Sequence, residues 1–180
     1  TSQDADKIVY NGVEHDLYSN PLEDYYKADA DRRPGFMIGP LSFSSANWRG
    51  YIANWEIAGG KLYLTKIDSW LCKGGTKESC HQVSLSELFP GKVSNSKVLA
   101  DWFSGELRVP VGKLLQYVHM GYGSTFERDL IFKVNKGAAS EAEIIDNTKR
   151  ELPSESEAAL KELQKLKDSP LGNKPAFGQA

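Results

Sequence analysis

Two alternating runs of apolar residues meet at a Gly-Gly pair between residues 48 and 67. In the first run every second residue from Tyr51 to Ile57 is apolar, which places these side chains on one face of an extended strand. Gly59-Gly60 then suits a tight turn, and a second alternating run returns from Lys61. The segment therefore predicts a two-stranded antiparallel hairpin with Trp55 in the core.

Further strand and turn patterns surround this hairpin. A hairpin is predicted at 7–18, because Asn11-Gly12 suits a type I′ turn, whose twist matches paired strands. Additional strands are predicted at 105–110 and 128–134, and the segment 113–118 fits either a helix or a strand, with the strand favoured. Short helices are predicted at 20–26 and 84–90, the first with Asn20 as its N-cap. We expect an α+β fold, with a mainly antiparallel sheet or a partly closed β-barrel, short helices and a C-terminal helical tail.

The composition changes after Gly137. Aromatic residues are absent from there to Phe177, and two serines, Ser140 and Ser154, each precede a glutamate at capping-box spacing. This pattern predicts a strand-rich globular domain at 1–139 and a polar helical tail at 140–180. Because an isolated helix of this length is marginal in water, the tail must pack on something, and we expect its own sheet, a second copy of the chain or a partner surface.

Length and charge limit the classes of partner. The chain of 180 residues is long enough for one domain with a real core. A surface that binds nucleic acid usually carries a basic stripe, whereas the Lys and Arg residues here are scattered among acids and the net charge is -2. No run approaches the ~18 apolar residues of a membrane-spanning helix. We expect no nucleic acid partner and no membrane span.

The two cysteines, Cys72 and Cys80, flank a short stretch that contains Gly74-Gly75. A bridge that closes so short a loop would contribute about 2.5 kcal/mol, and two free thiols at the base of a hairpin are the alternative. The first residues lack a basic patch followed by an apolar run, so a cytoplasmic location is expected, or export if the cysteines are bridged. Neither cysteines nor histidines have metal-ligand spacing, and we expect no metal and no cofactor.

Residues 117–129 bring together several side chains that could carry chemistry. His119 could act as a base oriented by Glu127, Ser124 could act as a nucleophile, and Tyr122 could contact a ligand. Gly121 and Gly123 would let the backbone approach a substrate or turn sharply. The sequence around Ser124 is neither a nucleophile elbow nor a phosphate loop, and a glycine-bearing turn between two strands explains the same residues.

Tryptophans provide a second kind of candidate site. Trp48, Trp70 and Trp102 could present flat faces to a carbohydrate or another small ligand, since exposed aromatic rings on a sheet stack on sugars and bases. The alternative is that these rings belong to the core.

Four stretches carry a resemblance to a known group. They are Trp-Arg-Gly-Tyr-Ile-Ala-Asn-Trp-Glu-Ile from Trp48, Gly-Lys-Leu-Tyr-Leu from Gly60, Asp-Trp-Phe-Ser-Gly-Glu-Leu-Arg-Val-Pro from Asp101 and Tyr-Val-His-Met-Gly-Tyr-Gly-Ser from Tyr117. In these stretches, which cover under half of the chain, the sequence resembles a group of small bacterial proteins of unassigned function. The resemblance implies a bacterial source and no particular chemistry.

Three functions fit these observations. The leading hypothesis is a non-catalytic bacterial interaction protein with a protein partner, possible forms being an inhibitor or an immunity-type protein. It depends on small size, mild acidity, the lack of a catalytic signature and a tail suited to contact. The second is a small hydrolase or transferase that uses His119, Ser124 and Glu127. The third is a carbohydrate- or small-ligand-binding module that uses the tryptophans.

Overall fold

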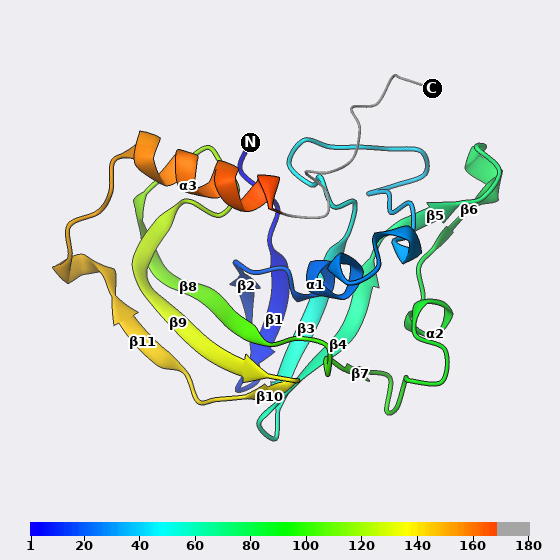
Figure 1. The fold of residues 1–180 in the computed structure, drawn as a ribbon, viewed down its shortest axis with the longest axis horizontal. Helices are drawn as coiled ribbons and strands as arrows, with labels where there is room; N and C mark the ends of the chain where they lie inside the picture. The colour runs from blue at the N-terminus through cyan, green and yellow to red at the C-terminus, as the bar shows by residue number, and fades with distance from the viewer. Residues whose placement is uncertain (169–180) are drawn as a thin grey trace.

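A nine-stranded sheet curves around most of the core in the computed structural model, which describes residues 1–168 (Figure 1). Its strands are β1 (Asp6–Tyr10), β2 (Val13–Leu17), β3 (Ile52–Ala58), β4 (Lys61–Asp68), β7 (Val98–Leu99), β8 (Gly105–Gln116), β9 (Thr125–Asn135), β10 (Ala138–Ala139) and β11 (Glu143–Asp146). A separate two-stranded ribbon consists of β5 (Trp70–Cys72) and β6 (Cys80–Gln82).

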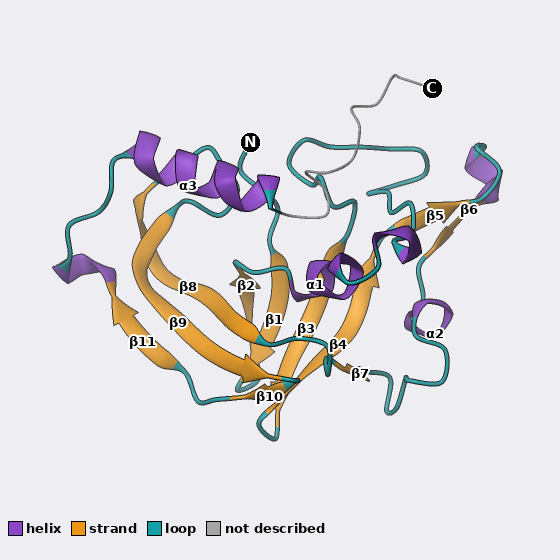
Figure 2. Cartoon of the chain, in the orientation of Figure 1, coloured by secondary structure: helices purple, strands orange, loops and turns teal. Residues whose placement is uncertain are grey.

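The helices are short and lie around the strands (Figure 2). They are the α-helices α1 (Pro21–Lys27), α2 (Leu85–Leu88) and α3 (Glu155–Lys167), and the 3-10 turns η1 (Ala30–Arg32), η2 (Lys77–Ser79) and η3 (Asn147–Lys149). Two of the α-helices begin with capping boxes, at Ser84 and Ser154, in which the serine side chain accepts a backbone N–H and a glutamate accepts the serine's own N–H. Both of these helix starts were predicted by the sequence.

The sheet closes almost completely into a barrel. The strand order is β11-β9-β10-β4-β3-β1-β2, and β8 pairs with the other side of β9. The gap between the two ends narrows where the Tyr18 N–H, just after β2, donates to the Arg108 carbonyl of β8 at 2.8 Å. Every named pair of strands is antiparallel except β1 with β3, in which Ile8 lies beside Trp55. The predicted α+β fold with a partly closed, mainly antiparallel barrel is confirmed.

The hairpin predicted from the alternating runs is present as β3 and β4. Its turn is Gly59-Gly60, and both glycines have the positive φ angles, 57° and 70°, that glycine adopts without strain. Trp55 is 1% exposed, as predicted. The strand starts at Ile52, later than the sequence suggested, and the register shifts between Asn54 and Trp55.

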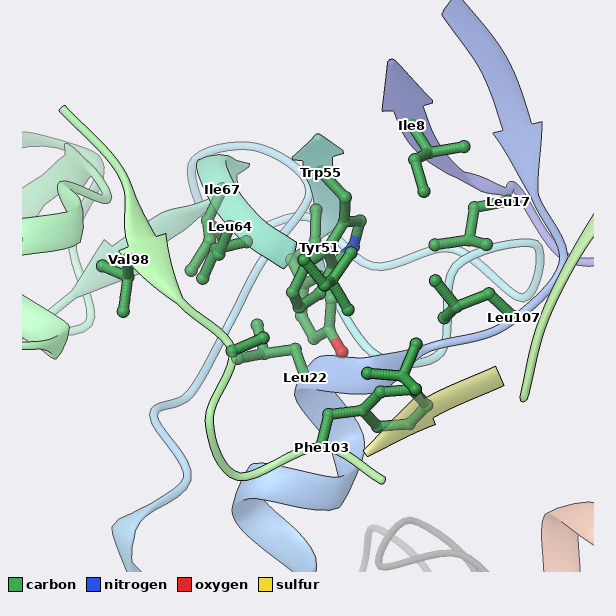
Figure 3. Close-up of a cluster of buried hydrophobic side chains, with 14 of the residues drawn as sticks. Ile8, Leu17, Leu22, Tyr51, Trp55, Leu64, Ile67, Val98, Phe103 and Leu107 are labelled. Carbon is green, nitrogen blue, oxygen red and sulfur yellow. The ribbon is translucent and has the colours of Figure 1, made fainter. Parts of the chain in front are cut away.

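The core fills the inside of the curved sheet (Figure 3). Apolar side chains converge from β1, β2, β3, β4 and β8, and aromatic rings from α1 and the connecting loops close one end. The central members are fully or almost fully buried: Ile8, Leu17, Leu22, Tyr51, Trp55, Leu64, Ile67, Val98, Phe103 and Leu107. Burying a large apolar side chain contributes about 1.5–3 kcal/mol, so this cluster is the main source of stability.

Other local predictions have mixed outcomes. The hairpin at 7–18 is confirmed as β1 and β2, and the ambiguous segment 113–118 is strand as far as Gln116. α1 begins with Pro21 as predicted, but the Asn20 side chain makes no cap hydrogen bond. Its Oδ1 instead accepts the hydroxyl of Tyr122 at 2.8 Å.

The predicted helix start at Ser140 is wrong. Residues that follow it form strand β11, which pairs with β9 and places Ile144 beside Leu130. The Ser140 hydroxyl accepts the N–H of Lys133 at 2.9 Å, so it holds the chain against β9 rather than capping a helix. Two adjacent β-branched residues, Ile144 and Ile145, favour the strand.

Candidate ligand-binding site

A cavity of about 520 Å³ lies between α1, α3, β8 and the loop that leads into β9. Its volume falls within the range of about 300–1,000 Å³ that is typical of small-molecule sites. Charged and aromatic side chains form much of its wall: Tyr18, Glu23, Trp48, Arg49, Arg108 and Tyr122. On the α3 side, Glu162 and Lys165 complete the lining.

Arg49 is fixed by a buried ion pair with Asp6. Asp6 begins β1, and because β1 runs parallel to β3, its carboxylate reaches the start of that strand. It accepts Arg49 Nη2 at 2.8 Å, the Ala53 N–H at 3.0 Å and Trp55 Nε1 at 3.1 Å. Burial raises the pKa of Asp6, against the lowering effect of the Arg49 charge and the two N–H donors. For Arg49, burial alone would lower the pKa, but the Asp6 carboxylate raises it, so the guanidinium stays charged.

The rest of the Arg49 guanidinium has hydrogen-bonding capacity to spare. Nη2 is used fully, since it also donates to the Asp4 carbonyl at 2.7 Å. Nε and Nη1 are buried and make no hydrogen bond within residues 1–168. The Tyr51 ring lies 5.3 Å from the guanidinium carbon and offers only its π face. Arg49 is 3% exposed, so water at the surface does not compensate.

Glu23 on α1 has an unpartnered acceptor, whereas Arg49 has unpartnered donors. Its Oε1 accepts Tyr51 Oη–H at 2.8 Å and Arg33 Nη1 at 2.9 Å. Its Oε2 is buried and accepts no hydrogen bond in the described part of the chain. Arg49 and Glu23 therefore flank Tyr51 and line one cavity, but their unpartnered atoms are buried and are not exposed to it.

Arg108 holds another wall of the cavity together. Its Nε donates to Asp129 at 2.9 Å, Nη1 donates to the Tyr122 carbonyl at 2.9 Å, and Nη2 donates to the Ser124 carbonyl at 2.8 Å. Asn147 of η3 donates to the other oxygen of Asp129 at 3.0 Å. β8, the loop that leads into β9, β9 itself and η3 are thus joined through one guanidinium and its carboxylate partner, which makes this wall rigid.

Aromatic rings form the remaining surface. Tyr18 and Tyr122 stack with centroids 4.8 Å apart, and the Arg108 guanidinium carbon lies 5.3 Å from the Tyr18 ring centroid. Burial raises the pKa of Tyr122 above its ordinary range, so its hydroxyl stays protonated. Trp48, which lines the same cavity, differs from these rings because it is 39% exposed.

The residues suggested for catalysis occupy separate positions. The exposed His119 ring bonds the Tyr117 hydroxyl at 2.7 Å through Nδ1. Ser124 is buried, and its hydroxyl accepts the Val118 N–H at 2.9 Å and donates to the Val118 carbonyl at 3.4 Å. Glu127 accepts the N–H of Lys113 at 2.9 Å. The structure records no hydrogen bond among His119, Ser124 and Glu127, whereas Tyr122 lies on the cavity wall.

The three candidate tryptophans are also separated. Trp48 lines the larger cavity, and Trp70 lines a smaller one of about 260 Å³. Trp102 stacks on Phe89 at 5.4 Å and donates its Nε1–H to the Pro21 carbonyl at 3.0 Å. Only Trp48 therefore shares a cavity with Arg49 and Glu23.

Sequence reasoning missed Arg49, Glu23 and Asp6. Arg49 precedes a strand and Glu23 follows a helix-starting proline, positions where a charged residue is normally solvated. The Arg49–Asp6 contact joins residues 43 positions apart, through a parallel pairing that no local pattern reveals. The one signal was Arg49 itself, the single charged residue in the stretch from Trp48 to Trp55.

Cys72 and Cys80 are joined by a disulfide across β5 and β6, with Cα atoms 3.9 Å apart.

Within residues 1–168 no group of three or more His, Cys, Asp or Glu side chains is arranged to hold a metal ion. None of the helices in that range has the length and apolar character needed to cross a membrane.

Comparison with family models, curated proteins and solved structures finds no match to this chain. The geometry of the cavity therefore carries the functional argument.

Proposed function

We propose that this chain is a non-catalytic binding protein that holds a small polar ligand in the cavity between α1 and α3. The observation that carries the proposal is the cavity of about 520 Å³, which places three cations, four acids and the partly exposed Trp48 around one volume. The cations are Arg49, Arg108 and Lys165, and the acids are Glu23, Asp24, Glu106 and Glu162. Charged groups make the stronger hydrogen bonds and an aromatic face supplies apolar contact, so this lining suits a small polar ligand.

The surroundings support a preformed site. Arg108 and its partners fix one wall, and the Asp6–Arg49 pair is anchored by β1 and β3. Rigid walls keep the entropy cost of binding low, which favours affinity. The non-catalytic part of the proposal is supported by the Ser124 hydroxyl, which is occupied by Val118 on both its donor and acceptor sides.

Blocking the cavity tests the proposal. Asp24 and Lys27 are both exposed residues of α1, but only Asp24 lines the cavity. Thermal unfolding of the full chain is measured with a panel of neutral saccharides, small anions and zwitterions, because a ligand that binds the folded state raises Tm by mass action. At least one class should raise Tm in the wild type and in Lys27→Trp but not in Asp24→Trp. A rise that persists in Asp24→Trp would contradict the proposed site.

A protein partner is the second candidate function, and the edge strand β11 favours it. Within the described residues β11 has a sheet neighbour only on its β9 side, and Ile144 and Ile145 are 65% and 40% exposed. Antiparallel pairing with a second copy would place Glu143 opposite Asp146, and like charges in that position are unfavourable. We propose that the partner is an extended segment of another protein with an apolar centre flanked by basic residues, which adds to this edge. An inhibitor or immunity-type role would use such a contact.

This second candidate has its own test. Binding of a synthetic peptide with two central valines flanked by lysines is compared with binding of the same peptide flanked by glutamates. The lysine peptide should bind more tightly, and Ile144→Lys should weaken it while the exposed control Leu160→Lys on α3 does not. Equal binding of the two peptides, or concentration-dependent dimers in light scattering, would contradict the proposed partner.

We also propose a bacterial and exported protein. The resemblance of the four sequence stretches supports the source. The Cys72–Cys80 disulfide supports export, because disulfides persist in oxidising compartments and are rare in the cytosol. Non-reducing mass spectrometry of the protein from its native cells would show the bridge, and reduced thiols there would favour the cytoplasm instead.

A further inference from the structure

The ion pairs of the cavity wall leave an excess of negative charge. Each cation of the lining has an acid within ion-pair distance: Arg49 with Asp6 at 2.8 Å, Arg108 with Asp129 at 2.9 Å and Lys165 with Glu162 at 3.0 Å. Glu23, a buried acid of the lining, is paired with Arg33 at 2.9 Å. Asp24 and Glu106 line the same cavity, and neither has an ion-pair partner within residues 1–168. Because the paired groups cancel, these two carboxylates make the wall negative.

The surroundings of Asp24 do not compensate its charge. Asp24 follows Glu23 directly on α1, and only Glu23 has an arginine partner. Partial burial raises the pKa of Asp24, Lys27 one turn further along the helix lowers it, and the Glu23 carboxylate raises it again, so that the balance is upward. A positive charge brought into the cavity would stabilise the ionised carboxylate.

Glu106 supplies the second negative charge from a different element. It lies near the start of β8, and its cross-strand neighbour on β9 is Lys133. These two side chains form no ion pair, and Glu106 lines the cavity while Lys133 does not. A cation in the cavity is therefore attracted by carboxylates on both α1 and β8, whereas an anion is repelled by them and meets only cations that already have an acid.

The third feature of the wall is the indole of Trp48. Tyr18 already has the Arg108 guanidinium 5.3 Å from its ring centroid, whereas the described part of the chain places no cation over Trp48, which is 39% exposed. Tryptophan offers the best ring face for a cation, and the attraction acts within about 6 Å of the ring centroid. The same face contacts the C–H groups beside an ammonium nitrogen, because it is apolar as well as electron-rich.

From these three features we infer that the ligand is a small organic ammonium ion, attracted by Asp24 and Glu106 and in contact with the face of Trp48. This inference rests on the proposed function and specifies the ligand class of the same cavity. It assigns the two carboxylates as specificity-determining groups, because they distinguish a cation from a neutral molecule or an anion of the same shape.

Calorimetric titration of the full chain with a matched series tests the charge of the ligand. Putrescine, 1,4-butanediol and succinate have carbon chains of equal length and end in ammonium, hydroxyl and carboxylate groups, and choline, glucose and phosphate extend the three classes. Putrescine or choline should bind, and the neutral and anionic probes should not. Glycine, whose carboxylate meets no unpaired cation on the wall, should bind more weakly than the cation.

The outcomes separate this inference from the proposed function. If a neutral or anionic probe binds as tightly as both cations, or binds when neither cation does, the ammonium inference is overturned while the proposed cavity function stands. If no probe of any class binds, both are overturned.

Variants then assign the contacts. Asp24→Asn and Glu106→Gln keep the side-chain shape and remove the charge, so each should raise the Kd of the cation about threefold. Trp48→Ala should raise it by a similar factor. Asp101→Asn is the matched control, because Asp101 is an exposed acid outside the cavity lining, and its Kd should equal that of the wild type. Equal effects of Asp24→Asn and Asp101→Asn would show a general attraction of cations to an acidic protein and would overturn the inference.

Discussion

Replacing Trp55 by phenylalanine isolates the hydrogen bond that links the core to the candidate site. Trp55 is 1% exposed, and its Nε1–H donates to Asp6 Oδ2 at 3.1 Å, while the other oxygen of Asp6 binds Arg49. Phenylalanine keeps most of the aromatic volume but removes the N–H. The change therefore leaves a buried carboxylate with one donor fewer and a small void beside it.

The expected loss of stability follows from these two effects. A hydrogen bond to a charged group contributes about 1.5–3 kcal/mol, and complete removal of a buried Trp side chain costs about 3–5 kcal/mol. A partial loss of volume together with the lost bond gives a decrease of about 3 kcal/mol in the free energy of unfolding. For a domain of this size each kcal/mol corresponds to ~2–4 °C, so Tm should fall by about 6–12 °C.

Thermal and urea unfolding, followed by far-ultraviolet circular dichroism, measure the change. The matched control is Trp48→Phe, a partly exposed tryptophan without a recorded ring partner, for which a change within about 0.5 kcal/mol is expected. The double variant Asp6→Asn/Trp55→Phe should be less destabilised than the sum of its single variants, because both remove the same bond. Equal losses in Trp55→Phe and Trp48→Phe, or strict additivity with Asp6→Asn, would refute the structural reasoning.

Other parts of the fold give further predictions. Replacing Cys72 and Cys80 by serine should lower the free energy of unfolding by about 2.5 kcal/mol through loop entropy, and dithiothreitol should affect the wild type but not the variant in denaturant titrations. Gly112→Ala should destabilise the chain by more than about 1 kcal/mol, since φ is +88° and the added Cβ would lie 2.9 Å from the Cβ of Glu127; an unchanged urea midpoint would contradict this. A chain that ends at Pro153 keeps every strand and should lose little in Tm, whereas one that ends at Gly137 lacks β10 and β11 and should lose far more; equal Tm values would contradict this.

Local patterns in the sequence predicted those parts of the fold that local forces determine. The β3–β4 hairpin follows from alternation and from Gly59-Gly60, because the side-chain period and the turn conformation lie within one segment. The capping box at Ser154 likewise gave the start of α3. At Ser140 the same pattern failed, because pairing with β9 outweighed helix capping once Ile144 and Ile145 could extend the sheet.

The candidate site depends on contacts that no local pattern contains. Asp6 and Arg49 meet because β1 lies parallel to β3, and Glu23 reaches Tyr51 because α1 covers the end of the barrel. Of the aromatic residues predicted to bind a ligand, Trp48 and Tyr122 lie at this cavity, and Trp70 and Trp102 lie elsewhere. Composition identified the residue type, but only the tertiary structure shows which tryptophan shares a cavity with Arg49 and Glu23.

The position of the tail connects the two functional hypotheses. β11 and η3, which follow residue 139, are bound to β9 by strand pairing and by the Asn147–Asp129 hydrogen bond. α3 lies beyond them, and Glu162 accepts the Tyr122 N–H at 3.3 Å while it also lines the cavity. Because most side chains of α3 are exposed, α3 can be displaced at lower cost than the barrel strands. A partner that engaged β11 would act on the chain that leads directly into α3, so contact with a protein and access to the cavity would be coupled through the same tail.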